Sequence, residues 1–369
     1  MIDLRQAFSA TYAQARVKFL EAAATAGLAI ESHLHPLAGR DGETLAMDVA
    51  LAGAPDARHL LVVSSGCHGV EGFCGSGVQV AALQDDEWRE RASGLGVAVL
   101  YIHALNPYGF SHLRRVTQEN VDLNRNFQDF SAPLPTNAAY AELHPLLLPA
   151  QWPPDAANQA AIGAYVQEHG MARFQTAVTQ GQHDFADGMF FGGSGPTWSN
   201  RVLREVLRRH VQVAEHLAWI DIHTGLGPSG LGERIFAAGN DAVTLQRARA
   251  WWGGAGDTPV TSFYDGSSSS SPVRGMLFNV VYDECPQSQY TGIAMEYGTL
   301  PLPDMIQALR AEHWLHLHPE APASQAAAIR QQMRDAFYVD TDAWKGQIVS
   351  QARQAMFQAA AGLAGGAPA

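Results

Sequence analysis

A short apolar run that leads straight into a glycine-rich turn constrains this chain more than any other stretch. The run, residues 60–65, has the length of a buried strand, and the turn after it carries His68 and Glu71. The spacing His-x-x-Glu brings both side chains to one side of a turn or first helical coil, and both residue types bind metals. Three glycines allow the turn to be tight, since glycine tolerates positive φ. A polar turn after a core strand has the same pattern, so a metal site needs further ligands.

Two more polar side chains end apolar runs of the same kind. Residues 218–222 lead into His223, and residues 292–295 lead into Glu296. The strand, helix and strand pattern of residues 60–103 predicts a parallel pair with a right-handed crossover. Open α/β sheets bind their ligands outside the carboxyl ends of such strands. We therefore predict that these side chains converge with the His-x-x-Glu turn at one edge of one sheet.

The converging side chains have the composition of a catalytic zinc site. His68, Glu71 and His223 supply two imidazoles and a carboxylate, a set that leaves the fourth zinc position open for water. For His223 alone, a core histidine with a satisfied hydrogen bond is the simpler interpretation, but the His-x-x-Glu turn favours a ligand. Asp221 lies two residues earlier on the same strand face. It is either a buried hydrogen-bonded carboxylate or a support for a ligand.

A second cluster, residues 113–127, holds three arginines in a region with few other cations. Surface arginines are common, and that interpretation remains open for all three. Asn124 and Arg125, however, place a planar amide beside a guanidinium, a pair suited to bidentate recognition of a carboxylate.

Taken in order, these pieces resemble the zinc carboxypeptidase-like (M14) metallopeptidases and their deacylase relatives. The matching motifs are His68-Gly-Val-Glu71, Asn106-Pro-x-Gly109, Arg114-Arg115, Asp122-Leu-Asn124-Arg125-Asn-Phe127, Asp221-Ile-His223-Thr and Glu296-Tyr-Gly-Thr299. With Trp198-Ser-Asn and the N-terminal helix, the chain is most similar to the DUF2817 branch. The resemblance implies an α/β fold, with a central mixed twisted sheet of about eight strands flanked by helices and one zinc ion per chain at its edge.

The resemblance also implies roles for the polar residues. Glu296 would be the general base, and either Arg114 or Arg115 would polarise the scissile carbonyl. The choice between these two arginines is open, because their spacing to the next motif varies within the family.

The same resemblance implies that Asn124 and Arg125 hold a terminal carboxylate and that Asp122 supports His68. The predicted function is a zinc-dependent hydrolase that cleaves an amide bond next to a free carboxylate by metal-activated water. Its substrate would be a small peptide or an acyl amino acid.

One departure affects the substrate. Digestive-type carboxypeptidases carry a mobile-loop tyrosine about two dozen residues before the catalytic glutamate, where this chain has a serine run and Arg274. Tyr264 and Tyr282 lie near but do not align. An amidohydrolase or deacylase of the desuccinylase type is therefore the alternative enzyme. A non-catalytic binding module on the same fold is the alternative outside enzymes, although the retained ligands and Glu296 disfavour it.

Charge and composition exclude some partners. The formal net charge is -12, with 36 acidic and 24 basic residues, so we predict binding neither to nucleic acid nor to a membrane. Three cysteines form no even framework, and we see neither a signal-like N-terminus nor an apolar run of about 20 residues. We expect a cytoplasmic protein. The sequence does not predict its oligomeric state.

The periodicity predicts an architecture of one domain over residues 1–358, followed by a flexible Ala/Gly tail at 359–369. Helices are expected near both ends and at 198–217, and a hairpin at the sheet edge is expected over residues 30–51. The serine-rich loop 266–272 is a candidate flexible lid.

Overall fold

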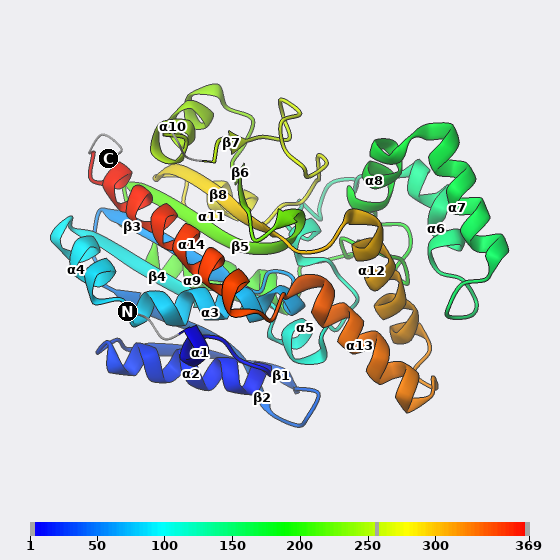
Figure 1. The fold of residues 1–369 in the computed structure, drawn as a ribbon. Helices are drawn as coiled ribbons and strands as arrows, with labels where there is room; N and C mark the ends of the chain where they lie inside the picture. The colour runs from blue at the N-terminus through cyan, green and yellow to red at the C-terminus, as the bar shows by residue number, and fades with distance from the viewer. Residues whose placement is uncertain (1–3, 255–257, 366–369) are drawn as a thin grey trace.

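The most apolar segments form the middle of a single sheet. The structure is a computed structural model that describes residues 4–254 and 258–365, and its strand order is β1-β2-β4-β3-β5-β8-β6-β7 (Figure 1). The strands are β1 Ile30–Ala38, β2 Thr44–Ala52, β3 His59–Ser65, β4 Val97–His103, β5 His216–Ser229, β6 Gly232–Phe236, β7 Val260–Thr261 and β8 Gln289–Gly298. Strands β4, β3, β5 and β8 run parallel, and antiparallel pairs flank them. The predicted mixed sheet of about eight strands is confirmed.

Helices cover the sheet, and three of them form a lobe at one side. The helices are α1 Leu4–Ala7, α2 Tyr12–Thr25, α3 Gly72–Leu83, α4 Asp86–Gly94, α5 Pro107–His112, α6 Ala138–Leu147, α7 Ala156–His169, α8 Met171–Thr179, α9 Trp198–His210, α10 Ala242–Trp252, α11 Asn279–Glu284, α12 Leu302–Leu317, α13 Ala323–Phe337 and α14 Asp342–Leu363, with 3-10 turns η1 Gly69–Glu71 and η2 Leu123–Arg125. Helices α3 and α14 pack on β3 and β5. Figure 1 shows α6, α7 and α8 projecting beyond the sheet beside α12.

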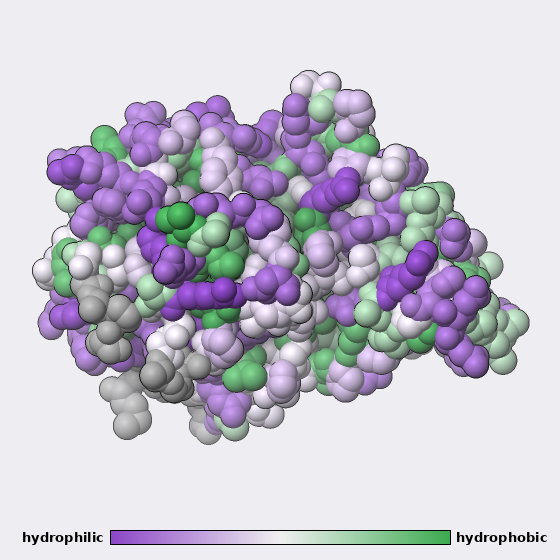
Figure 2. All heavy atoms as spheres, turned by 90° about the horizontal axis from the view of Figure 1, so that it is seen from above, coloured by the Kyte–Doolittle hydropathy of each residue, from purple (hydrophilic) through white to green (hydrophobic). Residues whose placement is uncertain are grey.

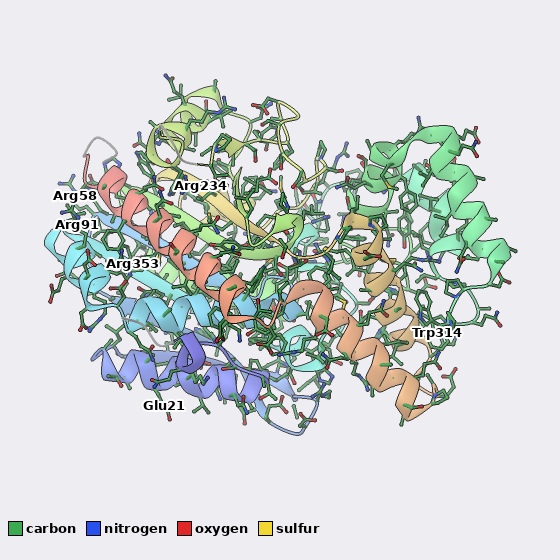
Figure 3. The ribbon with its side chains drawn as sticks, viewed as in Figure 1. Glu21, Arg58, Arg91, Arg234, Trp314 and Arg353 are labelled. Carbon is green, nitrogen blue, oxygen red and sulfur yellow. The ribbon has the colours of Figure 1, made fainter. Side chains whose placement is uncertain are left out.

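Side-chain contacts between distant elements tie the outer helices to this core. Arg353 of α14 donates to Asp85 at 2.6 Å and to Glu87 at 2.5 Å, which joins the last helix to the start of α4 (Figure 3). The face seen in Figure 2 is mostly hydrophilic, with apolar residues in small separate groups. Among the described residues, every helix is too short or too polar to cross a membrane.

Several sequence-based boundaries need correction. The helix expected at the N-terminus is broken, because Thr11 caps α2 by accepting a hydrogen bond from the amide of Gln14. The helix expected over 198–217 ends at His210, because residues from His216 onward pair with both β3 and β8. Strand β5 then continues to Ser229, so His223 lies inside the strand and not one residue beyond it.

The C-terminal end also differs from the prediction. Helix α14 continues through residues 359–363 and buries Ala359, Ala360 and Leu363 against the core, so the predicted flexible tail does not begin at residue 359. Residues 366–369 lie outside the described part. The single domain predicted over residues 1–358 stays a prediction.

Candidate metal centre and active site

The His-x-x-Glu turn is held in place by close backbone contact with the next strand end. After β3, Gly66 has φ of 66°, and a Cβ there would lie 3.1 Å from the Cβ of Ala104. At Gly69 a Cβ would lie 2.1 Å from the carbonyl carbon of Gly109, so only glycine fits. The two glycines therefore press this turn against the Asn106-Pro-x-Gly109 turn.

The same contact positions the arginine pair. The amides of Gly69 and Val70 donate to the carbonyls of Arg115 and Arg114 at 3.1 and 2.9 Å. Asn106 caps α5 through the amide of Gly109 and donates from its side chain to the Arg115 carbonyl at 3.3 Å. The arginine pair is thus attached through its backbone to the turn that carries the predicted ligands.

The three predicted metal ligands meet in one buried cluster. His68 Nδ1 lies 2.9 Å from Glu71 Oε1, and His223 Nδ1 lies 3.1 Å from Glu71 Oε2. The two Nδ1 atoms are 3.3 Å apart. Each of the three side chains is at most 5% exposed. The amide of Thr224 also donates to Glu71 Oε2, at 3.1 Å.

A carboxylate lies behind each imidazole. Asp221 Oδ2 is 2.6 Å from His223 Nε2, and Asp122 Oδ1 is 3.3 Å from His68 Nε2. The Asp221–His223 contact is the one that metal-ligating histidines commonly make, in which the second N–H is donated to a carboxylate. Two ring nitrogens and a carboxylate, all within 4.8 Å of one another, form an electron-rich set that fits a zinc ion. The residues therefore suit the predicted metal.

The charges in the cluster are mutually stabilising. Burial alone would raise the pKa of Glu71, but the adjacent His68 and His223 outweigh it and lower that pKa. Burial would lower the pKa of His223, yet Asp221 and Glu71 raise it well above its usual value. The pKa of Asp122 is held well below its usual value despite burial, chiefly by Arg115 and Arg125.

Glu296 lies beside this cluster on the neighbouring strand. It is the register partner of His223 in the parallel β5–β8 pair, and its Oε1 accepts a hydrogen bond from the amide of Leu226 at 2.9 Å. Burial, and then the Glu71 carboxylate, raise the pKa of Glu296 to about 7. A carboxyl group with that pKa can both accept and donate a proton near neutral pH.

The two candidate arginines occupy different surroundings. Arg115 donates from Nε to Asp122 Oδ2 at 2.9 Å, and its Nη2 lies 2.7 Å from His68 Nε2. Arg114 points away from the cluster, where its Nε donates to Glu312 at 2.5 Å. The sequence left the choice between them open, and the geometry favours Arg115. Arg114 instead joins this segment to α12 as a buried ion pair.

The predicted carboxylate-binding pair also reaches the site, but the side chains already have protein partners. Arg125 donates from Nε to the carbonyl of Thr179 at 3.1 Å and from Nη1 to its neighbour's carbonyl at 2.9 Å. Asn124 Oδ1 accepts from the amide of Leu277 at 2.8 Å. Burial lowers the pKa of Arg125 to about 10, so it remains charged at neutral pH. The ring of Phe190, which the sequence did not predict as part of the site, lies against both arginines. Its centroid is 5.1 Å from Cζ of Arg115 and 5.7 Å from Cζ of Arg125.

A single pocket contains this site and extends well beyond it. It encloses about 1110 Å³, part of it open to solvent. The charged residues in its wall belong to the metal cluster or lie next to it. The rest of the wall is mainly apolar, and we call this part the apolar chamber; its main residues are Trp219, Ile235, Phe263, Phe278, Tyr290 and Ala294.

Polar atoms in the chamber wall are turned toward protein partners. The indole N–H of Trp219 donates to Ser64 Oγ at 2.7 Å, and the hydroxyl of Tyr290 donates to the carbonyl of Ala237 at 2.8 Å. Along β8, Ala294 lies two residues before Glu296 and on the same strand face. The chamber therefore begins directly beside the charged cluster and presents an apolar surface.

The serine-rich loop lies over this pocket. Ser270 and Ser271 line it, and Ser271 Oγ accepts a hydrogen bond from Thr176 of α8 at 3.1 Å. Gln175 of the same helix donates to the carbonyl of Ser269 at 3.1 Å. The loop thus bridges the sheet and the helical lobe; its flexibility stays a prediction.

Neither tyrosine considered from the sequence is in the pocket wall. Tyr264 donates to the carbonyl of Ala238 at 3.1 Å, and the hydroxyl of Tyr282 accepts from the amide of Gly239 at 2.7 Å. Both hydroxyls are thus bonded to backbone groups outside the pocket wall.

Comparison with known proteins gives one family. The family model described as "Protein of unknown function (DUF2817)" matches residues 8–351. No curated protein matches the sequence.

Solved structures of metallo-carboxypeptidases are similar at low identity. Carboxypeptidase A from Helicoverpa armigera is 13% identical, over 89% of this chain and 74% of that one, with a TM-score of 0.44. Bovine thrombin-activatable fibrinolysis inhibitor, solved with tick carboxypeptidase inhibitor, is 11% identical over 90% and 98%, with a TM-score of 0.47. A metallo-carboxypeptidase from Pseudomonas aeruginosa, in complex with (2-guanidinoethylmercapto)succinic acid, is 15% identical over 92% and 68%, with a TM-score of 0.41.

Proposed function

The chain belongs to the DUF2817 family, and we propose that it is a zinc-dependent hydrolase that cleaves an amide bond next to a free carboxylate. One observation carries this proposal: Glu296 lies in register with His223, beside the cluster in which His68 Nδ1, His223 Nδ1 and Glu71 converge. This carboxyl group is the register partner of a predicted ligand and lines the same pocket as the three donors, which supports its role as the proton acceptor.

His68, Glu71 and His223 would hold the zinc ion. When bound, zinc supplies a Lewis acid and lowers the pKa of a coordinated water to about 7. Glu296 accepts the water proton at a carboxylate oxygen as the new C–O bond forms at the amide carbon. It then gives this proton to the amine nitrogen as the C–N bond breaks, so a single carboxyl group serves both steps.

In this proposal Arg115 stabilises the oxyanion. Its guanidinium lies in the pocket wall, beside His68, and carries a full positive charge that offsets negative charge developing on the carbonyl oxygen. Asp122 holds this arginine through Nε, so the other nitrogens remain directed at the cluster.

The substrate carries a carboxylate and a large apolar group. Arg125 donates from Nε and Nη2 to Thr179 and from Nη1 to Asn124, so two of its five N–H groups take no part in these bonds and would bind the anion. Asn124 is hydrogen bonded to Leu277, which also lines the pocket next to Phe278 of the apolar chamber. A group attached near the carboxylate would therefore enter the apolar chamber.

A deacylase of N-acyl amino acids is the second candidate within this proposal. It is favoured because Tyr264 and Tyr282, the tyrosines nearest in sequence to the digestive-type position, both lie outside the pocket wall. Both reactions use the same residues and differ only in the acyl group.

The test is a screen of zinc-loaded protein against C-terminally free dipeptides and N-acyl amino acids, with Glu296→Gln as the control. We expect hydrolysis by the parent and a loss of at least roughly a hundredfold in the variant, with unchanged zinc content, because a positioned general base typically contributes 10²–10⁴. A variant as active as the parent would remove Glu296 from the mechanism. If neither protein hydrolyses any compound, the non-catalytic binding module gains support.

A further inference from the structure

A chain of buried hydrogen bonds runs from the apolar chamber to the predicted metal ligand His223. Its members are Trp219, Ser64, Asp221 and His223, and each is at most 6% exposed. The indole Nε1 of Trp219 lies 2.7 Å from Ser64 Oγ, which lies 2.5 Å from Asp221 Oδ1. The other oxygen, Asp221 Oδ2, lies 2.6 Å from His223 Nε2.

The direction of this chain is fixed by chemistry. An indole N–H can only donate, so Ser64 Oγ must accept from Trp219. The single hydroxyl hydrogen of Ser64 is then free to donate to Asp221 Oδ1, because an ionised carboxylate only accepts. Asp221 Oδ2 in turn accepts the N–H at His223 Nε2. Asp221 thus keeps the ring hydrogen of His223 at Nε2, while Trp219 and Ser64 fix the orientation of the Asp221 carboxylate.

The consequence lies on the other side of the imidazole ring. With the hydrogen held at Nε2, the lone pair of the neutral ring lies at Nδ1, the atom that faces Glu71 and His68. Asp221 alone would also favour this state. Without Ser64, however, Asp221 Oδ1 loses its hydroxyl donor, and the bond to His223 alone orients the carboxylate.

We propose that Ser64 is a positioning residue of the metal centre, which locks Asp221 and thereby makes His223 present its Nδ1 lone pair to the metal. This inference rests on the proposed metal site. The sequence gives no local signal for it, because Ser64 and Asp221 are 157 positions apart and meet only through the β3–β5 register.

The strand provides its own control. Ser65 is the next residue of β3, is equally buried, and points to the opposite face, where its Oγ donates to Gln79 Oε1 at 2.8 Å. Ser64→Ala and Ser65→Ala therefore each remove one buried hydroxyl from the same strand. Only the first removes a group from the chain that ends at His223.

The experiment measures zinc affinity by competition with a fluorescent chelator, together with the melting temperature of the metal-free variants. We expect Ser64→Ala to bind zinc about 10- to 100-fold more weakly than the parent, the usual effect of losing a residue that orients a metal ligand. Ser65→Ala should lower the melting temperature as Ser64→Ala does, and keep the zinc affinity of the parent within about threefold. Equal zinc affinity in both serine variants would overturn the inference.

Two further variants keep the inference testable if Ser64→Ala does not fold. Ser64→Thr retains a hydroxyl and should restore most of the affinity. Trp219→Phe removes the indole donor and should weaken zinc binding about three- to tenfold, less than full loss of the serine hydroxyl. A Trp219→Phe protein with unchanged zinc affinity, together with a Ser64→Thr protein that binds zinc more than about tenfold more weakly than the parent, would contradict the chain. A parent that binds no zinc would overturn the metal site itself, whereas tight binding by all variants would overturn only this inference.

Discussion

The two ends of the pocket are formed by the same two strands, β5 and β8, but one end is charged and the other is apolar. At one end, His223 and Glu296 sit side by side, and every charged group has a charged or hydrogen-bonding neighbour. At the other end, Trp219 and Tyr290 turn their polar atoms toward the protein and leave an apolar surface. The charged end is suited to chemistry, and the apolar chamber is suited to choosing which molecule reaches it.

The two ends of the pocket should also differ in how well they tolerate substitutions. A buried charge that loses its partner is costly, so changes at the charged end should abolish metal binding or turnover. Apart from Trp219, which is hydrogen bonded to Ser64, a change in the apolar chamber should alter only the fit of one substrate group.

Loss of a metal ligand should have the largest effect. His68→Ala and His223→Ala should each lose most of the bound zinc, because the remaining two donors cannot hold it tightly. Elemental analysis of purified protein measures this directly. His216→Ala is the matched control, since His216 is the first residue of the same strand and is not part of the metal cluster. If the double variant of His68 and His223 binds zinc as well as the parent, the ligand assignment is wrong.

The second prediction concerns the carboxylate. Arg125→Ala should reduce kcat/KM for a substrate with a free carboxylate by roughly 2–4 kcal/mol equivalent, and should barely affect the corresponding amide. The reason is that only the charged substrate loses an ionic partner.

The contacts of Arg125 supply the competing explanation. Because it bonds to Thr179 and Asn124, it could serve mainly to hold the η2 turn in place. In that case both substrates would lose activity alike, and a comparison of acid and amide with both proteins distinguishes the two roles.

The third prediction sharpens the description of the apolar chamber. A substrate with phenylalanine next to the carboxylate should have a kcat/KM about 10- to 100-fold above that of its glycine counterpart, as expected for burying a large apolar side chain. Phe263→Ala should reduce this preference. Tyr264→Ala should not, since this neighbouring aromatic residue is outside the pocket wall. Equal rates for the two substrates in the parent would show that the chamber does not select.

The fourth and smallest effect is on stability. In metal-free protein the folded-state pKa of Glu296 is about 7, above the usual unfolded value of about 4.3. Between these values the folded state binds more protons, so its stability falls as pH rises from about 5 to 7. Glu296→Gln should remove this loss. The melting temperature of the variant, relative to that of the parent, should therefore rise by a few °C between pH 5 and pH 8. Melting curves in chelator measure it, and a difference that does not change with pH would contradict the assigned cause.

Much of the site followed from local pattern. Apolar runs predicted the four parallel strands, and the polar residues at or near their ends predicted His68, Glu71, His223 and Glu296 as one group. This works because parallel strands with helical crossovers must bring their carboxyl ends to one edge. His223 lies inside β5 and not beyond its end, but the predicted grouping still held, because β8 continues to pair with β5 at that position.

Other parts of the structure could not be predicted from local sequence pattern, because they depend on contacts between distant residues. Strands β6 and β7 are short and were missed, although β6 supplies Ile235 to the apolar chamber. The preference for Arg115 over Arg114 depends on contacts between two motifs that are distant in the sequence. The backbone amides of the glycine-rich turn donate to the carbonyls of both arginines and so fix their positions. The continuation of α14 through residues 359–363 depends on the core that buries Ala359 and Ala360.

The sequence by itself determined the kinds of side chain available and the sheet edge at which they gather, because strand polarity and crossover handedness leave few arrangements. Only the tertiary structure decided which side chains touch: the bond of Ser64 to Asp221, the stacking of Phe190 under two arginines, and the apolar chamber beside Glu296. These contacts join residues far apart in the chain. They depend on the register between strands and on close packing of the whole core, which no local stretch of sequence specifies.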